Sequence, residues 1–381
     1  MSTIRRVVTG FGAVSGVVLL ASGLMALVVL LLGGDPGRAL AAIHTGSLAS
    51  PGSLAETLLK ATPLMFTGLS VAVAFRAGIW NIGAEGQFLM GMLGATLAAL
   101  LLPPLPVIVG APLCLLAGLL AGLIWAAGPA LLKARRQVPE VISTIMLNFL
   151  AVHLIEYLVR GPLKDPRSAS DWSPMLPEAT YLPYLGSLLG VRLLGGGAIA
   201  WPGGPPVLAT GIETHRLHIG VILAVAVLGG VWLWMDRTGA GFRLRALGFN
   251  PAAARSAGVA TERAAATAFL ISGALAGLGG AVEILGLIQR LYRYAPGSPG
   301  YGFSGIAVAL LGGLEPLGVL GAALFFGALS AGCSQMQRSA GVSAQVALVV
   351  QSCLVFLLLL LRDRLGILLR GRASASSTDS L

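Results

Sequence analysis

The sequence predicts an all-α membrane protein with about ten transmembrane helices. Of its 381 residues, 56% are hydrophobic and only 10% are charged, whereas a soluble domain carries about 25% charged residues. A helix needs about 20 predominantly apolar residues to cross a bilayer, and apolar stretches near that length recur along the chain. The basic residues fall mainly in short segments between these stretches. We therefore expect a protein that is solvated mostly by lipid.

The apolar stretches define the expected helices in order along the chain. The first follows Arg5 and Arg6 and is longer than the apolar region of about 7 to 15 residues in a cleaved signal peptide, which predicts an uncleaved first helix. The eighth is short, and a Gly-Leu-Glu-Pro turn at 313–316 separates it from the ninth. The ten expected helices lie at 12–33, 54–75, 86–102, 107–131, 141–159, 218–235, 264–286, 302–314, 317–333 and 344–361.

The distribution of Lys and Arg predicts that both termini are cytoplasmic. Cytoplasmic segments are enriched in basic residues, and ten passes in this orientation place 15 of the 25 basic residues on the inside. Long external segments, such as 161–217, count less for orientation. We expect one transmembrane domain over 1–372, a long cytoplasmic loop at 236–263 and a disordered polar tail at 373–381.

Composition and motifs argue against several other functions. The net charge of +10 would suggest nucleic-acid binding in a soluble protein, but the orientation of a membrane protein explains it better. A P-loop requires Gly-Lys-Ser/Thr, and none of the three lysines lies in that context. The cysteines and histidines do not have metal-ligand spacing. We therefore expect no catalytic residue, no metal and no cofactor in this chain.

A polar, glycine-rich segment at 77–91 separates the second expected helix from the third. It reads AGIWNIGAEGQFLMG and contains Asn81, Glu85 and Gln87. Polar groups at membrane depth are costly unless they line a cavity or pack inside protein. We therefore predict that these residues line or gate a solute pathway, with Glu85 as the strongest candidate. Asn148, in the fifth expected helix, faces either this pathway or another helix.

Other charges at membrane depth favour structural roles. Glu56 and Lys60 are four residues apart, as are Glu156 and Arg160, and this spacing is typical of ion pairs on a helix surface. Glu140 falls in the first turn of the fifth expected helix, where a carboxylate complements the helix dipole.

The cytoplasmic loop contains a predicted short helix. Asn250 and Pro251 have the pattern of an N-cap followed by proline at the first helical position. Ala253 and its alanine neighbours favour a helix, and Gly258 can end it. A helix of about two turns that carries Arg255 is therefore expected at the cytoplasmic surface. These residues alone leave open whether it is part of an ordinary basic loop or a docking helix for a cytoplasmic motor.

Five blocks of the sequence carry a resemblance to a known family. The blocks are TPLMFTGLSVAVAFRAGIWNIGAEGQFLMGMLGA at 62–95, EVISTIMLNFLA at 140–151, RALGFNPAAARSAGV at 245–259, SGALAGLGGAVEILG at 272–286 and GFSGIAVALLGGLEPLGVL at 302–320. They resemble the inner-membrane permeases of ABC importers of the branched-chain amino acid and simple-sugar type. The resemblance runs over about 50–362, and within that group the chain most resembles the nucleoside permeases linked to basic membrane lipoproteins.

This resemblance implies a fold, a set of partners and a location. The fold is the ten-helix importer type shared with vitamin B12 and ribose permeases. The partners are a second, similar permease, a cytoplasmic ATP-binding subunit and an extracytoplasmic substrate-binding protein or lipoprotein. Residues 250–258 correspond to the coupling helix that docks on the ATPase, and the location is the bacterial inner membrane. The chain departs from the family at a Gly/Pro-rich extension, 195–206, where we expect little regular structure.

The predicted function is that of a permease subunit that forms half of an ATP-driven import pathway for a nucleoside or a similar small polar solute. A permease for a simple sugar is the alternative within the same family. From another class, an ion-coupled secondary transporter also uses broken helices at mid-membrane, and a structural or sensory subunit would have no pathway. Ala253→Pro distinguishes an ATP-driven importer from an ion-coupled transporter. It should abolish ATPase binding in the importer and leave ion coupling in the transporter largely intact.

Overall fold

The computed structural model contains two compact units. One unit is Ser47–Ala331, and the other combines Met1–Gly46 with Gly332–Leu381. The structure describes residues 20–31, 33–103, 105–136, 138–185, 192–194, 198–200, 207–208, 216–293, 300–341, 343, 345–346, 348–350 and 352–353.

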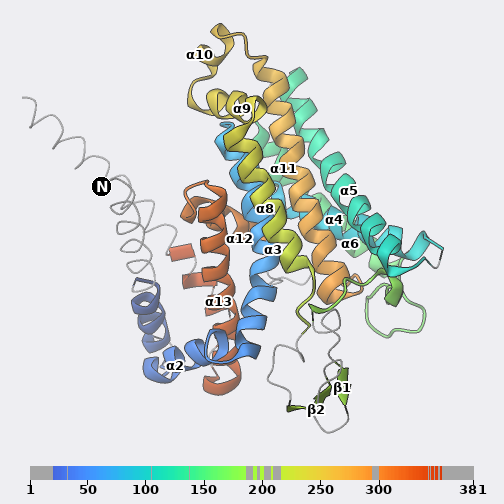
Figure 1. The fold of residues 1–381 in the computed structure, drawn as a ribbon, viewed down its shortest axis with the longest axis vertical. Coiled ribbons are helices and arrows are strands. Elements are labelled where there is room, and N and C mark those ends of the chain that lie inside the picture. The colour runs from blue at the N-terminus through green and yellow to red at the C-terminus, as the bar shows by residue number, and fades with distance from the viewer. Residues whose placement is uncertain are drawn as a thin grey trace, which may run out of the picture. The chain divides into compact units, whose positions relative to one another are not determined.

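Helices dominate the unit Ser47–Ala331 (Figure 1). The helix between α11 and α12, η2, is a single π-type turn that continues α11. In chain order the helices are α3 (Pro51–Arg76), α4 (Ala84–Leu101), α5 (Val107–Arg136), α6 (Glu140–Arg160), η1 (Glu178–Thr180), α8 (Gly220–Arg237), α9 (Gly239–Phe249), α10 (Pro251–Ser256), α11 (Thr261–Glu283), η2 (Ile284–Ile288), α12 (Tyr301–Leu311) and most of α13 (Pro316–Ala340).

Within the described part of the chain, seven helices are long and apolar enough to cross a membrane: α3, α4, α5, α6, α8, α11 with η2, and α13. The protein is therefore a polytopic helical membrane protein. α12 has 11 residues, in agreement with the short eighth helix that the sequence predicts. The first and tenth expected helices fall partly outside the described residues, which include a helix at Leu20–Leu31.

α3 begins with a capping box. The Oγ atom of Ser50 accepts a hydrogen bond from the Ser53 backbone N–H at 3.1 Å, and the Oγ atom of Ser53 accepts one from the Ser50 N–H at 2.9 Å. Pro51 occupies the first helical position, where a missing N–H costs nothing. Helices that are apolar on all sides belong in the interior, and α3 and α11 are mostly buried, whereas α5 and α6 expose most of their surface.

Glycines bring α4, α5 and α11 into backbone contact. Gly118 and Gly122 of α5 face Gly273 and Gly277 of α11, and Gly91 of α4 also lies against Gly277. A Cβ atom at Gly122 or Gly91 would overlap the facing backbone. Small residues at four-residue spacing permit such close approach between membrane helices, and they therefore fix the packing around the polar segment.

The segment 161–217 contains more regular structure in its described part than the sequence predicts. β1 (Arg192–Leu194), β2 (Ala198–Ala200) and β3 (Val207–Leu208) form a three-stranded antiparallel sheet in the order β1-β2-β3. Ile199 pairs with Leu193 on one side and with Val207 on the other. The expectation of little regular structure at 195–206 is thus wrong for β2, whose central residue, Ile199, is a β-branched residue suited to a strand.

The unit that contains both chain ends includes a helix that the sequence analysis did not predict. α2 (Pro36–Ser47) begins after Asp35, whose Oδ1 accepts a hydrogen bond from the Gly37 N–H at 2.8 Å. The Asp-Pro pair was the available signal, since Asp favours the N-cap and Pro the first helical position. Gly332 of α13 packs directly on Ile43 of α2.

Candidate solute pathway and coupling surface

The polar segment at 77–91 contains the connection between two apolar helices. α3 ends at Arg76 and α4 begins at Ala84, so residues 77–83, here called the break, are not helical. Gly78 has φ +73, a left-handed conformation that glycine adopts without the steric cost of a Cβ atom. The polar residues that the sequence identifies therefore lie in the break and in the first turn of α4.

Asn81 joins the break to α4 and α11. Its Nδ2 donates hydrogen bonds to Oε1 of Gln87 at 2.9 Å and to Oγ of Ser272 at 2.7 Å. Its Oδ1 accepts from the Gly83 N–H at 2.9 Å and from Nε2 of Gln87 at 3.2 Å. Ser272 is in turn 3.0 Å from Ser70 of α3. These buried groups form one connected network, which holds the break in a defined conformation.

Glu85 caps α12. Its Oε2 accepts hydrogen bonds from the backbone N–H groups of Gly302 at 2.6 Å and Phe303 at 3.3 Å. The first N–H groups of a helix have no partner within the helix, and this end carries partial positive charge. A carboxylate satisfies both needs, although it is only 1% exposed. The close approach requires glycine at 302, because a Cβ there would overlap the Glu85 backbone.

Asn148 fastens the break to α6. Its Oδ1 accepts a hydrogen bond from the Gly86 N–H at 2.8 Å, and its Nδ2 donates to the Ile82 carbonyl at 2.9 Å. One side chain thus satisfies two backbone groups that no helix can satisfy at this point. The structure therefore brings all four predicted pathway residues, Asn81, Glu85, Gln87 and Asn148, around the break, and all four are buried.

Two further residues hold the break and were not singled out as site residues from the sequence. Ser272 accepts from Asn81, but a serine in an apolar helix carries no distinctive signal. Glu140 contacts Lys133 at the end of α5, and its Oε1 accepts from the Trp80 N–H at 3.4 Å. The sequence analysis placed Glu140 correctly in the first turn of α6, but it did not predict the contact with the break.

The ion pairs predicted from helix spacing are present. Lys60 Nζ lies 3.5 Å from Oε1 of Glu56, and Arg160 Nη2 lies 3.1 Å from Oε1 of Glu156. Arg160 also bonds to Asp171 in the external segment. These charges therefore have structural partners, as the sequence predicts.

The loop 236–263 contains the predicted short helix, α10. Oδ1 of Asn250 accepts hydrogen bonds from the N–H groups of Ala252 and Ala253, both at 3.0 Å, and Pro251 is the first helical residue. Gly258, at φ +81, follows the end of the helix. The preceding helix α9 was not predicted, although Thr238 supplies a cap by accepting from the Gly241 N–H at 3.1 Å.

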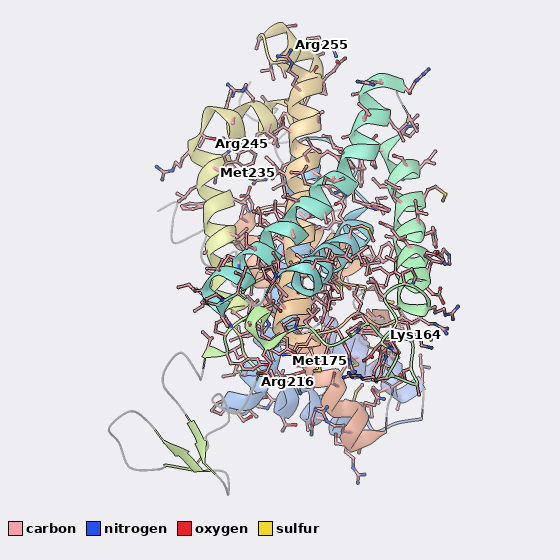
Figure 2. The ribbon with its side chains drawn as sticks, turned by 90° about the vertical axis from the view of Figure 1, so that its right-hand side faces the viewer. Lys164, Met175, Arg216, Met235, Arg245 and Arg255 are labelled. Carbon is pink, nitrogen blue, oxygen red and sulfur yellow. The ribbon has the colours of Figure 1, made fainter. Side chains whose placement is uncertain are left out.

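α9 and α10 lie at one end of the bundle, beyond α8 and α11 (Figure 1). Arg245 and Arg255 lie toward this end, whereas Lys164 and Arg216 lie toward the opposite end (Figure 2). The loop 236–263 and the residues Lys164 and Arg216 of the segment 161–217 therefore lie at opposite ends of the helices (Figure 2), as their predicted assignment to opposite faces of the membrane requires.

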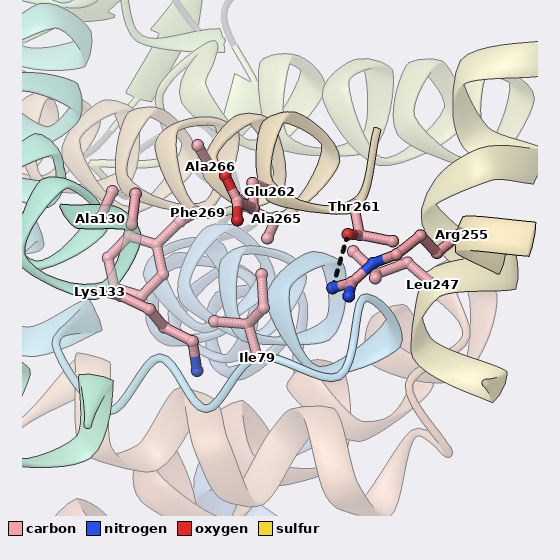
Figure 3. Close-up of a pocket in the computed structure, with 11 residues that line it drawn as sticks. Ile79, Ala130, Lys133, Leu247, Arg255, Thr261, Glu262, Ala265, Ala266 and Phe269 are labelled. Carbon is pink, nitrogen blue, oxygen red and sulfur yellow. Dashed lines mark hydrogen bonds between the residues drawn. The ribbon is translucent and has the colours of Figure 1, made fainter. Parts of the chain in front are cut away.

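A pocket of about 200 Å³ opens between the break and this loop. Ile79 of the break, Phe269 of α11 and Lys133 of α5 line it, together with Arg255 of α10. Figure 3 shows Lys133 and Arg255 on opposite sides of the pocket, with the Arg255 guanidinium directed toward Thr261, 3.5 Å from its hydroxyl oxygen. The predicted coupling helix and the predicted pathway segment thus share the wall of one cavity.

Comparison with known proteins identifies the family. Residues 53–361 match the family described as the branched-chain amino acid transport system permease component. The chain is 36% identical over 367 residues to the glucose ABC transporter permease protein TsgB13 of Haloferax volcanii, which covers 95% of this chain and 90% of that protein. It is 34% identical over 339 residues to the guanosine ABC transporter permease protein NupP of Bacillus subtilis, covering 87% of each.

Bacillus subtilis also has a guanosine ABC transporter permease protein NupQ, to which the chain is 29% identical over 271 residues, or 71% of this chain and 78% of that protein. Two similar permeases in one organism suggest a second permease subunit, and an ABC permease implies an ATPase and a binding protein as partners. Membership in this family excludes the ion-coupled alternative. The chain belongs to the permease component family of ABC importers, as a non-catalytic, multi-pass subunit of the cytoplasmic membrane.

Proposed function

We propose that this chain forms half of the pathway of an ATP-driven importer for nucleosides or closely related polar solutes. The similarity to NupP over 87% of the chain supports this solute class. The other half is a second, homologous permease, with a cytoplasmic ATP-binding subunit and an extracytoplasmic binding protein or lipoprotein completing the importer. The observation that carries the proposal is the buried amide network of Asn81 and Gln87 in the break between the two apolar helices α3 and α4.

The ten-pass arrangement with cytoplasmic termini is part of this proposal. Arg76, Asp236 and Glu315 meet in ion pairs. They belong to the end of α3, the end of α8 and the turn before α13. The ten-pass count places all three on the cytoplasmic side, so their contact supports that count, as does the position of Arg255 opposite Lys164 (Figure 2).

Asn81, Glu85, Gln87 and Asn148 are proposed to line or gate the pathway. In the described conformation their polar atoms bond to one another, to Ser272 and to nearby backbone. Opening the break would free amide donors and acceptors, and these are the groups that recognise hydroxyls and nucleobase edges. In the closed state these polar groups hydrogen-bond to one another and to backbone, so none of them is left buried without a partner.

α10 is proposed to be the coupling helix that docks on the ATPase. Asn250, Pro251 and Gly258 define its ends, while Ala253 and Arg255 belong to the helix itself. Five of its six residues are exposed, with only Ala254 buried. A rigid, exposed helix beyond the bundle supports a docking role.

Uptake by the complete complex in proteoliposomes tests the function. With the ATPase, the second permease and the binding protein present, we expect ATP-dependent uptake of labelled guanosine. Asn81→Ala and Glu85→Gln should each reduce that uptake by at least about tenfold, since one lost interaction of about 1.4 kcal/mol in the transition state has this effect. Unchanged uptake in both assembled variants would remove these residues from the pathway.

A simple sugar is the second candidate solute, because TsgB13 is named a glucose permease and is 36% identical. Labelled guanosine and labelled glucose should be compared as substrates in the same assay. ATP-dependent uptake of guanosine alone supports the nucleoside proposal, whereas uptake of glucose alone replaces it with the sugar alternative.

A further inference from the structure

Arg76 connects three elements that are distant in the sequence. Its side chain is only 12% exposed. Nη1 lies 3.8 Å from Oδ1 of Asp236 at the end of α8, and Nη2 contacts the carboxylate of Glu315 in the turn before α13. Asp236 also accepts from Nη1 of Arg245 in α9 at 3.0 Å. The end of α3 is thereby tied to the loop 236–263 and to the α12–α13 turn.

The loop 236–263 also contacts the break through a close backbone–backbone approach. Gly248 of α9 packs against the carbonyl of Arg76 and the N–H of Gly78, so close that a Cβ at 248 would overlap the Arg76 carbonyl. Interatomic contact of this kind resists compression, because packed atoms leave no free space. A movement of α9 toward the membrane therefore displaces the start of the break.

α12 completes a closed ring of contacts. Glu85, just beyond the break, holds the first turn of α12 through the N–H groups of Gly302 and Phe303. At the other end, the turn after α12 holds Glu315, which contacts Arg76. The chain connects Arg76 to Glu85 through the break, so the break and α12 form one ring, fastened at Arg76 and at Glu85.

We propose that Arg76 is the positioning residue that makes the loop 236–263, the break and α12 move together. This inference rests on the proposed function, in which α10 receives motion from an ATPase and the break gates the solute pathway. The guanidinium suits the role because its two terminal nitrogens point to two carboxylates at once, one in contact with Glu315 and one at ion-pair distance from Asp236. Without it, α9 can still press on the break through Gly248, but it cannot draw the break back or move α12 with it, and ATP hydrolysis is uncoupled from uptake.

The test measures solute taken up per ATP hydrolysed in the assembled complex. For Arg76→Gln we expect the ratio to fall about tenfold, within the usual range of coupling between sites, while ATP hydrolysis continues. Arg76→Lys keeps the positive charge but loses the planar guanidinium, so its ratio should lie between those of the wild type and Arg76→Gln. Adding Glu315→Gln to Arg76→Gln should lower the ratio no further, because both changes open the same ring.

Two control variants alter similar features outside the ring. Glu56→Gln removes the ion pair with Lys60, and Gly230→Ala adds a methyl group where no atom lies within 4 Å. Both should keep the wild-type ratio, whereas Gly248→Ala should lower it.

The outcomes separate this inference from the proposed function. If wild-type complex shows ATP-driven uptake but Arg76→Gln keeps the wild-type ratio, the positioning role is wrong and the function stands. The same holds if uptake and hydrolysis fall in equal proportion, since that indicates a structural loss. If wild-type complex takes up no solute, the proposed function fails, and this inference fails with it.

Discussion

Glu85 has a defined structural partner. A carboxylate in an apolar region draws attention as a pathway residue, and the sequence offers only Arg76 as a nearby basic partner. In the structure the partner is a helix end 217 residues away along the chain, at Gly302. Arg76 instead contacts Asp236 and Glu315. Backbone N–H groups carry no signal in a sequence, so this partner was invisible until the chain was folded.

The cap makes a prediction about stability. Glu85→Gln keeps an acceptor oxygen but removes the charge, so we expect a loss of about 1 kcal/mol, the difference between hydrogen bonds to charged and to neutral acceptors. Glu85→Leu leaves two N–H groups buried without an acceptor and should cost about 2–5 kcal/mol. Unfolding of the purified protein in detergent measures both. Equal stability of the two variants would contradict the cap.

At the scale of elements, the helices follow their local signals closely. The Asn-Pro start of α10 lies where the sequence places it, whereas α3 begins at Pro51, three residues before the start expected from the apolar stretch, because of a capping box that was not predicted. α9 was missed because its three glycines have low helix propensity and its cap is a single threonine. The break was predicted from polarity, but the helices that hold it, α6, α11 and α12, were identified only from the structure.

The N-cap of α10 allows a matched pair of variants. Asn250→Ala removes the acceptor for two N–H groups and should destabilise the helix by about 1 kcal/mol, whereas Asn250→Ser keeps a good cap. We expect the alanine variant to retain less ATP-binding subunit during purification of the complex, and the serine variant to retain the wild-type amount. Equal retention by both would argue against docking through α10.

At the scale of the whole molecule, composition and basic residues predict a polytopic bundle, and seven spanning helices are present among the described residues. The packing of that bundle depends on glycines in α4, α5 and α11. Their spacing indicates that helices meet, but spacing does not indicate which pairs meet. The meeting of the ends of α3, α8 and α12 in ion pairs likewise depends on the three-dimensional arrangement.

The ten-pass topology predicts opposite accessibility for two exposed positions, Ala169 and Ala257. In a cysteine-free background, Ala169→Cys should react with a membrane-impermeant maleimide added outside intact cells. Ala257→Cys should react only after the membrane is permeabilised. Reaction of both from the outside would contradict the orientation. Of the three native cysteines, Cys353 is the most important to replace in this background, because it is exposed whereas Cys114 and Cys333 are buried.

The sequence by itself determined the class of this protein, because hydrophobicity, charge distribution and helix caps act locally or additively along the chain. It also located the break and all four of its candidate polar residues. Only the tertiary structure decided what those residues bond to. Asn81, Asn148 and Glu85 reach partners 191, 62 and 217 positions away, and Arg76 joins elements that meet only when the bundle is packed. Such contacts depend on which helices are neighbours, and non-local packing decides that.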